Sequence, residues 1–176
     1  MSGHSKWAQI KHKKAVTDAR RSKVFSKLVR FLTVESRRAK GDRNAPGLRL
    51  AVEKAKQANM PSDNIDRAIE KGRGDTGVAM EEVLYESYGP GGVALLIMGL
   101  TDSRNRTAAE LKHLLSKHGA SLASPGAALW AFTKTAEGFS PQTTVELSDT
   151  DAEALDRLVD ELEEYDDVQD VYTNAA

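Results

Sequence analysis

The chain has 176 residues, of which 40% are apolar and none is cysteine, so it can bury a core in one large or two small domains but cannot form disulfides or thiolate metal sites. Its longest apolar run, residues 93–100, is too short to cross a membrane, and no apolar signal sequence follows the N-terminus. We therefore expect a cytoplasmic protein. A mitochondrial transit peptide is a weaker alternative, because Trp7 and Ile10 do not fit an Arg- and Ser-rich repeat.

Charge is strongly segregated along the chain, although the net charge is only −1. Residues 1–43 contain 13 Lys and Arg but three acidic residues, whereas residues 138–176 contain 12 acidic residues and a single Arg. The basic end is suited to a polyanion, and nucleic acid is the commonest polyanion in a cell.

Residues 1–16 are predicted to form a basic arm that contacts nucleic acid. Trp7 has two interpretations, because its ring could stack on a base or pack against a protein core. The other predicted contacts of the arm are basic side chains that would meet phosphates: Lys6, Lys11, His12, Lys13 and Lys14.

A long helix is expected next, from a Thr17 cap to about residue 40, before Gly41. Its apolar residues recur at helical spacing, and Glu35 is almost its only acidic residue. A solvated charged helix would intersperse Glu with Lys, so nucleic-acid binding is the favoured interpretation. The predicted phosphate contacts are Arg20, Arg21, Lys23, Lys27, Arg30, Arg37 and Arg38.

Two further helices, beginning near Pro46 and Ser62, are expected to complete a small helical domain. The glycine-rich residues 72–80 are the best linker candidate, so we place the domains at 1–76 and 77–176. Beyond the linker the apolar period changes, which predicts strands and helices joined by short connections. The predicted strands are residues 83–87, 93–100, 120–123, 127–133, 143–147 and 168–173, and the predicted helices are residues 107–118 and 149–167.

The expected fold class is therefore α+β, a small helical domain followed by a sandwich of helices on one face of a mainly antiparallel sheet. No catalytic constellation, cofactor motif or metal site is recognisable in the sequence, and the four histidines lack suitable spacing. The polar residues 102–107 could bind an anion at a helix N-terminus or simply cap it. The acidic helix is either a solvated face or a shield that repels nucleic acid from that end.

Several long motifs, in order along nearly the whole chain, resemble the YebC/PmpR family. They are residues 3–7 (GHSKW), 10–14 (IKHKK), 88–93 (YGPGGV), 101–107 (TDSRNRT), 143–147 (TTVEL) and 168–174 (VQDVYTN).

This resemblance implies a non-catalytic protein with a helical N-terminal domain and α+β domains. Members of the family are described as probable transcriptional regulators that bind DNA, and they include a mitochondrial translational activator of cytochrome oxidase. Bacterial members are linked to the relief of ribosomes stalled on proline-rich sequences. In one respect the chain departs from the family, because only residues 134–142 stand where members carry a further ferredoxin-like domain.

The sequence thus predicts a non-enzymatic, nucleic-acid-binding regulator of gene expression, with DNA and transcription as the first interpretation. A ribosome-associated translation factor that contacts ribosomal RNA is the alternative, and an adaptor that binds proteins through the acidic helix is a third. We expect no cofactor, metal, membrane or small-molecule substrate. The oligomeric state and the target sequence stay open.

Overall fold

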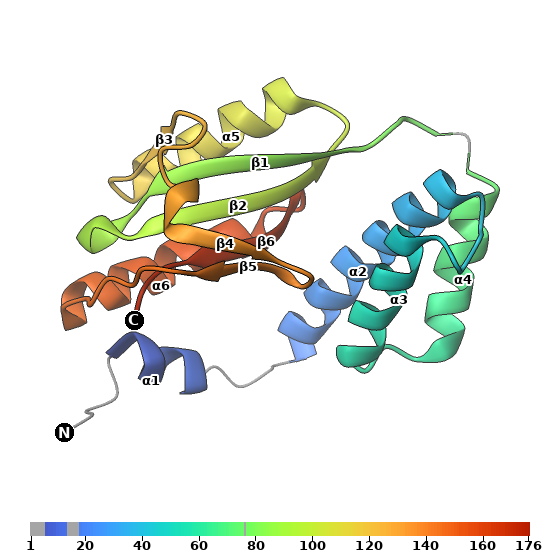
Figure 1. The fold of residues 1–176 in the computed structure, drawn as a ribbon, viewed down its shortest axis with the longest axis horizontal. Coiled ribbons are helices and arrows are strands. Elements are labelled where there is room, and N and C mark those ends of the chain that lie inside the picture. The colour runs from blue at the N-terminus through green and yellow to red at the C-terminus, as the bar shows by residue number, and fades with distance from the viewer. Residues whose placement is uncertain (1–5, 14–17, 76) are drawn as a thin grey trace. The chain divides into compact units, whose positions relative to one another are not determined.

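The computed structural model describes residues 6–13, 18–75 and 77–176, apart from the side chains of His12 and Lys13. The described chain forms two compact units. The helical unit extends from α2 to Met80, and the α+β unit comprises the residues from Glu81 onward together with α1 (Figure 1). Thr17, the predicted helix cap, and Lys14 lie outside the described residues.

The helical unit consists of α2 (Asp18–Ala39), α3 (Pro46–Gln57) and α4 (Ser62–Arg73). These bounds agree with the predicted helices, because apolar side chains at helical spacing meet in one core. Gly72 allows α4 to approach α2 closely, since a Cβ there would meet the backbone oxygen of Thr33. Ser36 on α2 donates a hydrogen bond of 2.6 Å to the Ile69 carbonyl of α4. The buried core consists of Leu32, Leu48, Ala51, Ala55, Met60, Ile65, Ala68 and Ile69.

The glycine-rich segment after α4, predicted to be a linker, is held against α2 by two arginines. Arg37 forms an ion pair with Asp75 and donates a 2.6 Å hydrogen bond to the carbonyl of Val78. Arg38 donates to the carbonyl of Met80 at 3.3 Å. The division between the two compact units follows Met80, and the domain boundary at residue 76 stays a prediction.

The α+β unit is built on a four-stranded antiparallel sheet, which confirms the predicted fold class. Its order is β3-β1-β2-β6, and these strands span Ser121–Ala123, Glu81–Tyr88, Ala94–Thr101 and Val168–Thr173. Two helices, α5 (Arg104–Lys117) and α6 (Asp149–Glu164), pack on one face of the sheet (Figure 1). Side chains from both meet Leu95 and Ile97 of β2 in the larger core.

The other face of the sheet carries a second, smaller core. The alternate residues of β2, Ala94 and Leu96, point to this face, since successive side chains of a strand point in opposite directions. They are covered by a 3₁₀ turn, η2 (Leu129–Ala131), and by a hairpin of β4 (Phe132–Thr135) and β5 (Gly138–Pro141). This double burial explains why residues 93–100 are apolar without alternation.

The hairpin differs from the predicted elements. Residues 127–133 were expected to form one strand, but a 3₁₀ turn occupies their middle and β4 begins only at Phe132. Residues 134–142, expected to be a simple connection, contain β5. Residues 143–147 form no named strand and contribute one isolated parallel bridge, from Val145 to Ala175, next to the end of β6. A second 3₁₀ turn, η1 (Pro90–Gly92), joins β1 to β2.

The N-terminal segment also differs from the predicted arm, because Lys6–Lys13 forms a helix, α1, that packs on α6. Trp7 is only 7% exposed and belongs to the larger core of the α+β unit. Lys6 pairs with Glu153 of α6 at 3.5 Å. The helical unit is thus inserted in sequence between α1 and β1 of the other unit.

Candidate nucleic-acid interface

The N-terminal half of α2 presents its cations as one stripe. Successive residues of an α-helix are rotated by about 100°, so four of the predicted contacts fall within a sector of roughly 80°. The opposite side of the helix carries the residues that face the helical core, among them Phe25, Val29 and Leu32. The stripe consists of Arg20, Lys23, Lys27 and Arg30.

Little acidic charge accompanies the stripe. Asp18 is the sole acidic residue between positions 18 and 31, and it lies 3.8 Å from Arg21 on an exposed part of the helix. Arg21 lies on another side of the helix from the stripe, so this ion pair does not involve the stripe residues. A positive helix face without interspersed carboxylates is the electrostatic pattern of a phosphate-binding surface.

The predicted contacts Arg37 and Arg38 both bind other parts of the helical unit. Arg38 pairs with the buried carboxylate of Glu35 at 2.7 Å, in addition to its bond to Met80. The guanidinium of Arg37 donates to Asp75 and, together with the backbone N–H of Gly77, holds the pKa of Asp75 below its usual value. Both side chains therefore attach Asp75, Val78 and Met80 to α2. No sequence pattern pairs Arg37 with an acid 38 residues away, so this role could be found only from the structure.

The residues of α1 are divided between packing and surface. Trp7 takes the core-packing alternative, since it is buried, and Lys6 is engaged by Glu153. Lys11 is exposed. The predicted contacts Lys14 and the side chains of His12 and Lys13 lie outside the described residues.

The polar residues at the start of α5 form a structural network, not an open anion site. Ser103 caps the helix and accepts from the backbone N–H of Arg106 at 3.4 Å. The buried carboxylate of Asp167 accepts from Arg106 at 3.0 Å and from the hydroxyl of Thr107 at 2.8 Å. Burial, followed by hydrogen bonding to Glu110 and Asp167, raises the pKa of Tyr165, which donates to the same carboxylate at 3.0 Å.

No cluster of three or more His, Asp and Glu side chains in the described part of the chain could hold a metal ion. No helix in these residues is both long and apolar enough to span a bilayer.

Comparison with family models gives matches along nearly the whole chain. The model described as the TACO1/YebC protein N-terminal domain matches residues 5–75. The model described as the TACO1/YebC second and third domain matches residues 80–138 and 135–175. These matches confirm the resemblance seen in the sequence motifs.

Individual relatives agree with the family models. A protein of Fervidobacterium nodosum is 39% identical over 235 residues, which cover 99% of this chain and 93% of the relative. One of Halothermothrix orenii is 48% identical over 165 residues, covering 93% of this chain and 63% of the relative. Both relatives are named probable transcriptional regulatory proteins. The crystal structure of the conserved hypothetical protein Aq1575 from Aquifex aeolicus has a TM-score of 0.79 at 34% identity, covering 98% of this chain and 97% of that one.

The matches also show where this chain differs from its relatives. The alignment to the Fervidobacterium nodosum protein has 235 positions, so that relative contains residues absent from the 176 residues of this chain. The match to the second family model is divided at residues 135–138, which form the turn between β4 and β5. The same place was identified from the sequence as the position of the missing segment.

Proposed function

This chain belongs to the TACO1/YebC family, and we propose that it is a non-enzymatic regulator of gene expression that binds nucleic acid through α2. The observation that carries the proposal is the stripe of four cations on the part of α2 where Asp18 is the single acidic residue. The relatives' name, probable transcriptional regulatory protein, favours DNA as the ligand and transcription as the process.

The stripe would act by replacing counterions along a phosphate backbone. Each Lys or Arg that neutralises a phosphate releases a condensed cation, which makes the affinity depend steeply on salt. Contacts of this kind position the protein but do not read the base sequence. Amide side chains suited to direct base readout are scarce near the stripe, so we expect weak sequence preference.

The first prediction concerns the slope of affinity against salt. Replacing Arg20, Lys23, Lys27 or Arg30 singly by Gln should weaken binding to every duplex sequence and make the slope of log K against log salt less steep by about 1. The four replacements together should nearly abolish binding at physiological salt. Fluorescence anisotropy with a labelled duplex, over a series of salt concentrations, measures both quantities in the full chain.

Matched variants separate the stripe from general charge effects. Lys112→Gln removes an exposed cation from α5 and should leave the slope unchanged. Arg38→Gln should lower the melting temperature, because Arg38 binds Glu35 and Met80. Its effect on the affinity for the duplex should be smaller than that of Lys27→Gln. An affinity that does not depend on salt, or equal losses from Lys112→Gln and Lys27→Gln, would contradict the proposal.

The class of nucleic acid is tested by selection from a random duplex library, in parallel with titration of a structured RNA. A regulator of transcription that binds mainly phosphates should give at most a weak consensus and should bind duplex DNA at least as tightly as the RNA. Strong preference for the structured RNA would instead indicate a role in translation.

A further inference from the structure

The side of α2 that carries the cationic stripe continues, beyond Arg30, beneath a segment of the chain that follows α4. Successive residues of an α-helix are rotated by about 100°, so Arg37 lies within about 20° of the direction of Arg30, two turns further along. Asp75 and residues 77–80, here called the strap, bind α2 at this place. Arg30 itself donates to the sulfur of Met80 at 3.9 Å. The strap therefore occupies the C-terminal continuation of the stripe.

Polar contacts hold the strap on α2, and none of its described residues is fully buried. Arg37 forms an ion pair with Asp75 and donates to the carbonyl of Val78 at 2.6 Å. Arg38 donates to the carbonyl of Met80 at 3.3 Å. The side chain of Val78 is 69% exposed. Polar contacts at a partly exposed surface contribute little to stability, so a competing anion can replace them.

Asp75 stands on Arg37 where an external anion could bind. One oxygen of its carboxylate accepts from Arg37, and the other accepts from the backbone N–H of Gly77 at 2.7 Å. The Nε atom of Arg37 is buried and has no hydrogen-bond partner in the part of the chain that the structure describes. A buried donor without an acceptor is costly. A phosphate can accept from Nε and a terminal nitrogen of one guanidinium together, so it would satisfy Arg37 more completely than Asp75 does.

We propose that the strap is a displaceable cover, and that a phosphate backbone bound along the stripe extends to Arg37 and takes the place of Asp75. The inference rests on the proposed function and adds a consequence of binding, the release of the strap. Arg38 stays with the buried carboxylate of Glu35, 2.7 Å away, and gives up only its bond to the strap. Release adds about six residues to the free connection between α4 and β1, a reach of up to about 20 Å.

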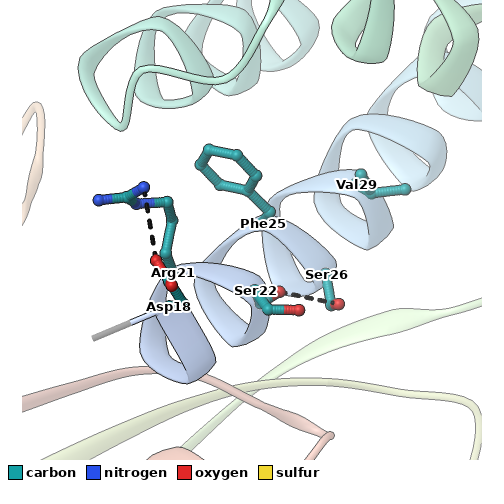
Figure 2. A pocket seen from close by; sticks show the side chains of 6 residues that line it. All are labelled: Asp18, Arg21, Ser22, Phe25, Ser26 and Val29. Carbon is teal, nitrogen blue, oxygen red and sulfur yellow. Dashed lines mark hydrogen bonds and ion pairs between the residues drawn. The ribbon is translucent and has the colours of Figure 1, made fainter. Parts of the chain in front are cut away.

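The opposite side of the same helix is less suited to a phosphate. Because α2 has 22 residues and α3 and α4 have 12 each, its first turns are incompletely covered there. Figure 2 shows Asp18 paired with Arg21, the only cation in the lining of the resulting hollow, so a phosphate would also meet the carboxylate. The hollow is lined by Asp18, Arg21, Ser22, Phe25, Ser26 and Val29 (Figure 2).

The first test is a double-mutant cycle in the full chain, measured by fluorescence anisotropy with a labelled duplex. Asp75→Asn should tighten binding by about 2-fold to 5-fold, because the strap then competes less well for Arg37. Arg37→Gln should weaken binding and make the slope of log K against log salt less steep by about 1, as expected of a phosphate contact. Adding Asp75→Asn to Arg37→Gln should bring no further gain in affinity.

A matched variant separates the strap from general repulsion between acidic side chains and nucleic acid. Glu70→Gln removes the same charge from α4, where Glu70 lies 3.8 Å from Arg73 and is 69% exposed. It should change the affinity less than Asp75→Asn does. Equal gains from the two variants, or a gain from Asp75→Asn that persists in the Arg37→Gln background, would overturn the inference.

A label on the strap reports its release directly. The chain has no cysteine, so Val78→Cys provides a single attachment point for a spin label at an exposed position. Saturating duplex should narrow the spectrum of this label, because the strap moves faster once it has left α2. The same label at Lys112→Cys, on the exposed surface of α5, should keep its spectrum.

The outcomes separate this inference from the proposed function. Duplex binding that leaves the spectrum of the Val78 label unchanged would overturn the release of the strap and leave the phosphate-binding stripe standing. An Arg37→Gln variant with native affinity and salt slope would overturn the phosphate contact at Arg37. Failure of the native protein to bind the duplex would remove both proposals.

Discussion

At the scale of single residues, Glu86 shows how a buried carboxylate can organise a loop. Its side chain is 6% exposed and accepts backbone N–H bonds from Gly126 at 2.6 Å, Ala128 at 2.7 Å and Leu129 at 2.8 Å. Burial raises the pKa of Glu86, but the three donors together outweigh burial and hold the pKa below its ordinary value of 4.5. The charged form is therefore the one that fixes the loop.

Glu86→Gln should lower the free energy of unfolding of the α+β unit by about 1–3 kcal/mol at neutral pH, because an amide NH₂ cannot accept from a backbone N–H. The contribution of Glu86 is fully present above its unfolded pKa and is lost as the pH falls through the lower folded value. The difference between native protein and variant should consequently shrink in acid. Urea unfolding at neutral and acidic pH measures it.

The exposed Glu137, in the hairpin turn, offers a control of the same charge. Glu137→Gln should change stability by less than about 0.5 kcal/mol at either pH. A variant Glu86→Gln as stable as the native protein would show that the loop does not depend on the carboxylate.

The sequence predicted the candidate site only in part, and the difference arises at particular residues. Arg20, Lys23, Lys27 and Arg30 were recognisable because local composition and helical spacing suffice to define a basic face. The contacts of Trp7, Arg37 and Arg38 are with residues distant in sequence. Such contacts cannot be predicted from local spacing or composition. Phe25 was recognised as apolar, but its incomplete cover follows from the lengths of three helices packed together.

At the scale of elements, the hairpin of β4 and β5 depends on one glycine. Gly138 has φ +131°, and a Cβ at this position would collide with the hydroxyl of Tyr172 on β6. Gly138→Ala should thus lower the free energy of unfolding by about 2–4 kcal/mol, which combines backbone strain with overpacking. Gly126→Ala should introduce backbone strain alone, because φ of Gly126 is +87° and no atom lies within 4 Å of an added Cβ. It should therefore lower the free energy of unfolding by about 1–2 kcal/mol.

Chemical denaturation of both variants and of the native protein measures the two losses in free energy of unfolding. Equal losses would mean that contact with Tyr172 does not constrain the hairpin. The edge-on contact of Phe139 with Tyr172, with ring centroids 5.5 Å apart, should weaken together with the hairpin in Gly138→Ala.

Elements with strong internal periodicity were predicted well, and those that depend on distant partners were not. The three helices of the helical unit have clear apolar stripes and recognisable ends, such as Pro46 in the first turn of α3. In contrast, α1 has eight residues, too few to be stable alone in water, and forms where Trp7 can pack on α6. Residues 143–147 have the composition of a strand, but they make one isolated bridge to the residues after β6, and a pairing with a distant segment cannot be read from composition.

At the scale of the whole molecule, the two units have separate cores, so we expect two unfolding transitions. Trp7→Ala should lower the stability of the α+β unit by about 3–5 kcal/mol, because it removes a large side chain from the core, and should leave the helical unit nearly unchanged. Differential scanning calorimetry should show the transition of the α+β unit at a lower temperature and that of the helical unit unchanged.

Lys11→Ala, on the exposed surface of the same helix, is the control and should leave both transitions in place. If Trp7→Ala shifted the two transitions together, the units would unfold as one cooperative body. The glycine-rich stretch would then not separate independent domains.

The packing of α1 on α6 has a consequence for the order of events during synthesis. A ribosome makes α1 first, but the core that buries Trp7 also contains Leu155 and Leu158 of α6, which are made near the end of the chain. The helical unit has its whole core within residues 32–69 and can fold while the rest is still being translated. The α+β unit must wait for α6 and for β6, its last strand, and contacts so distant in sequence form slowly. The first helix to be synthesised is therefore among the last to reach its place.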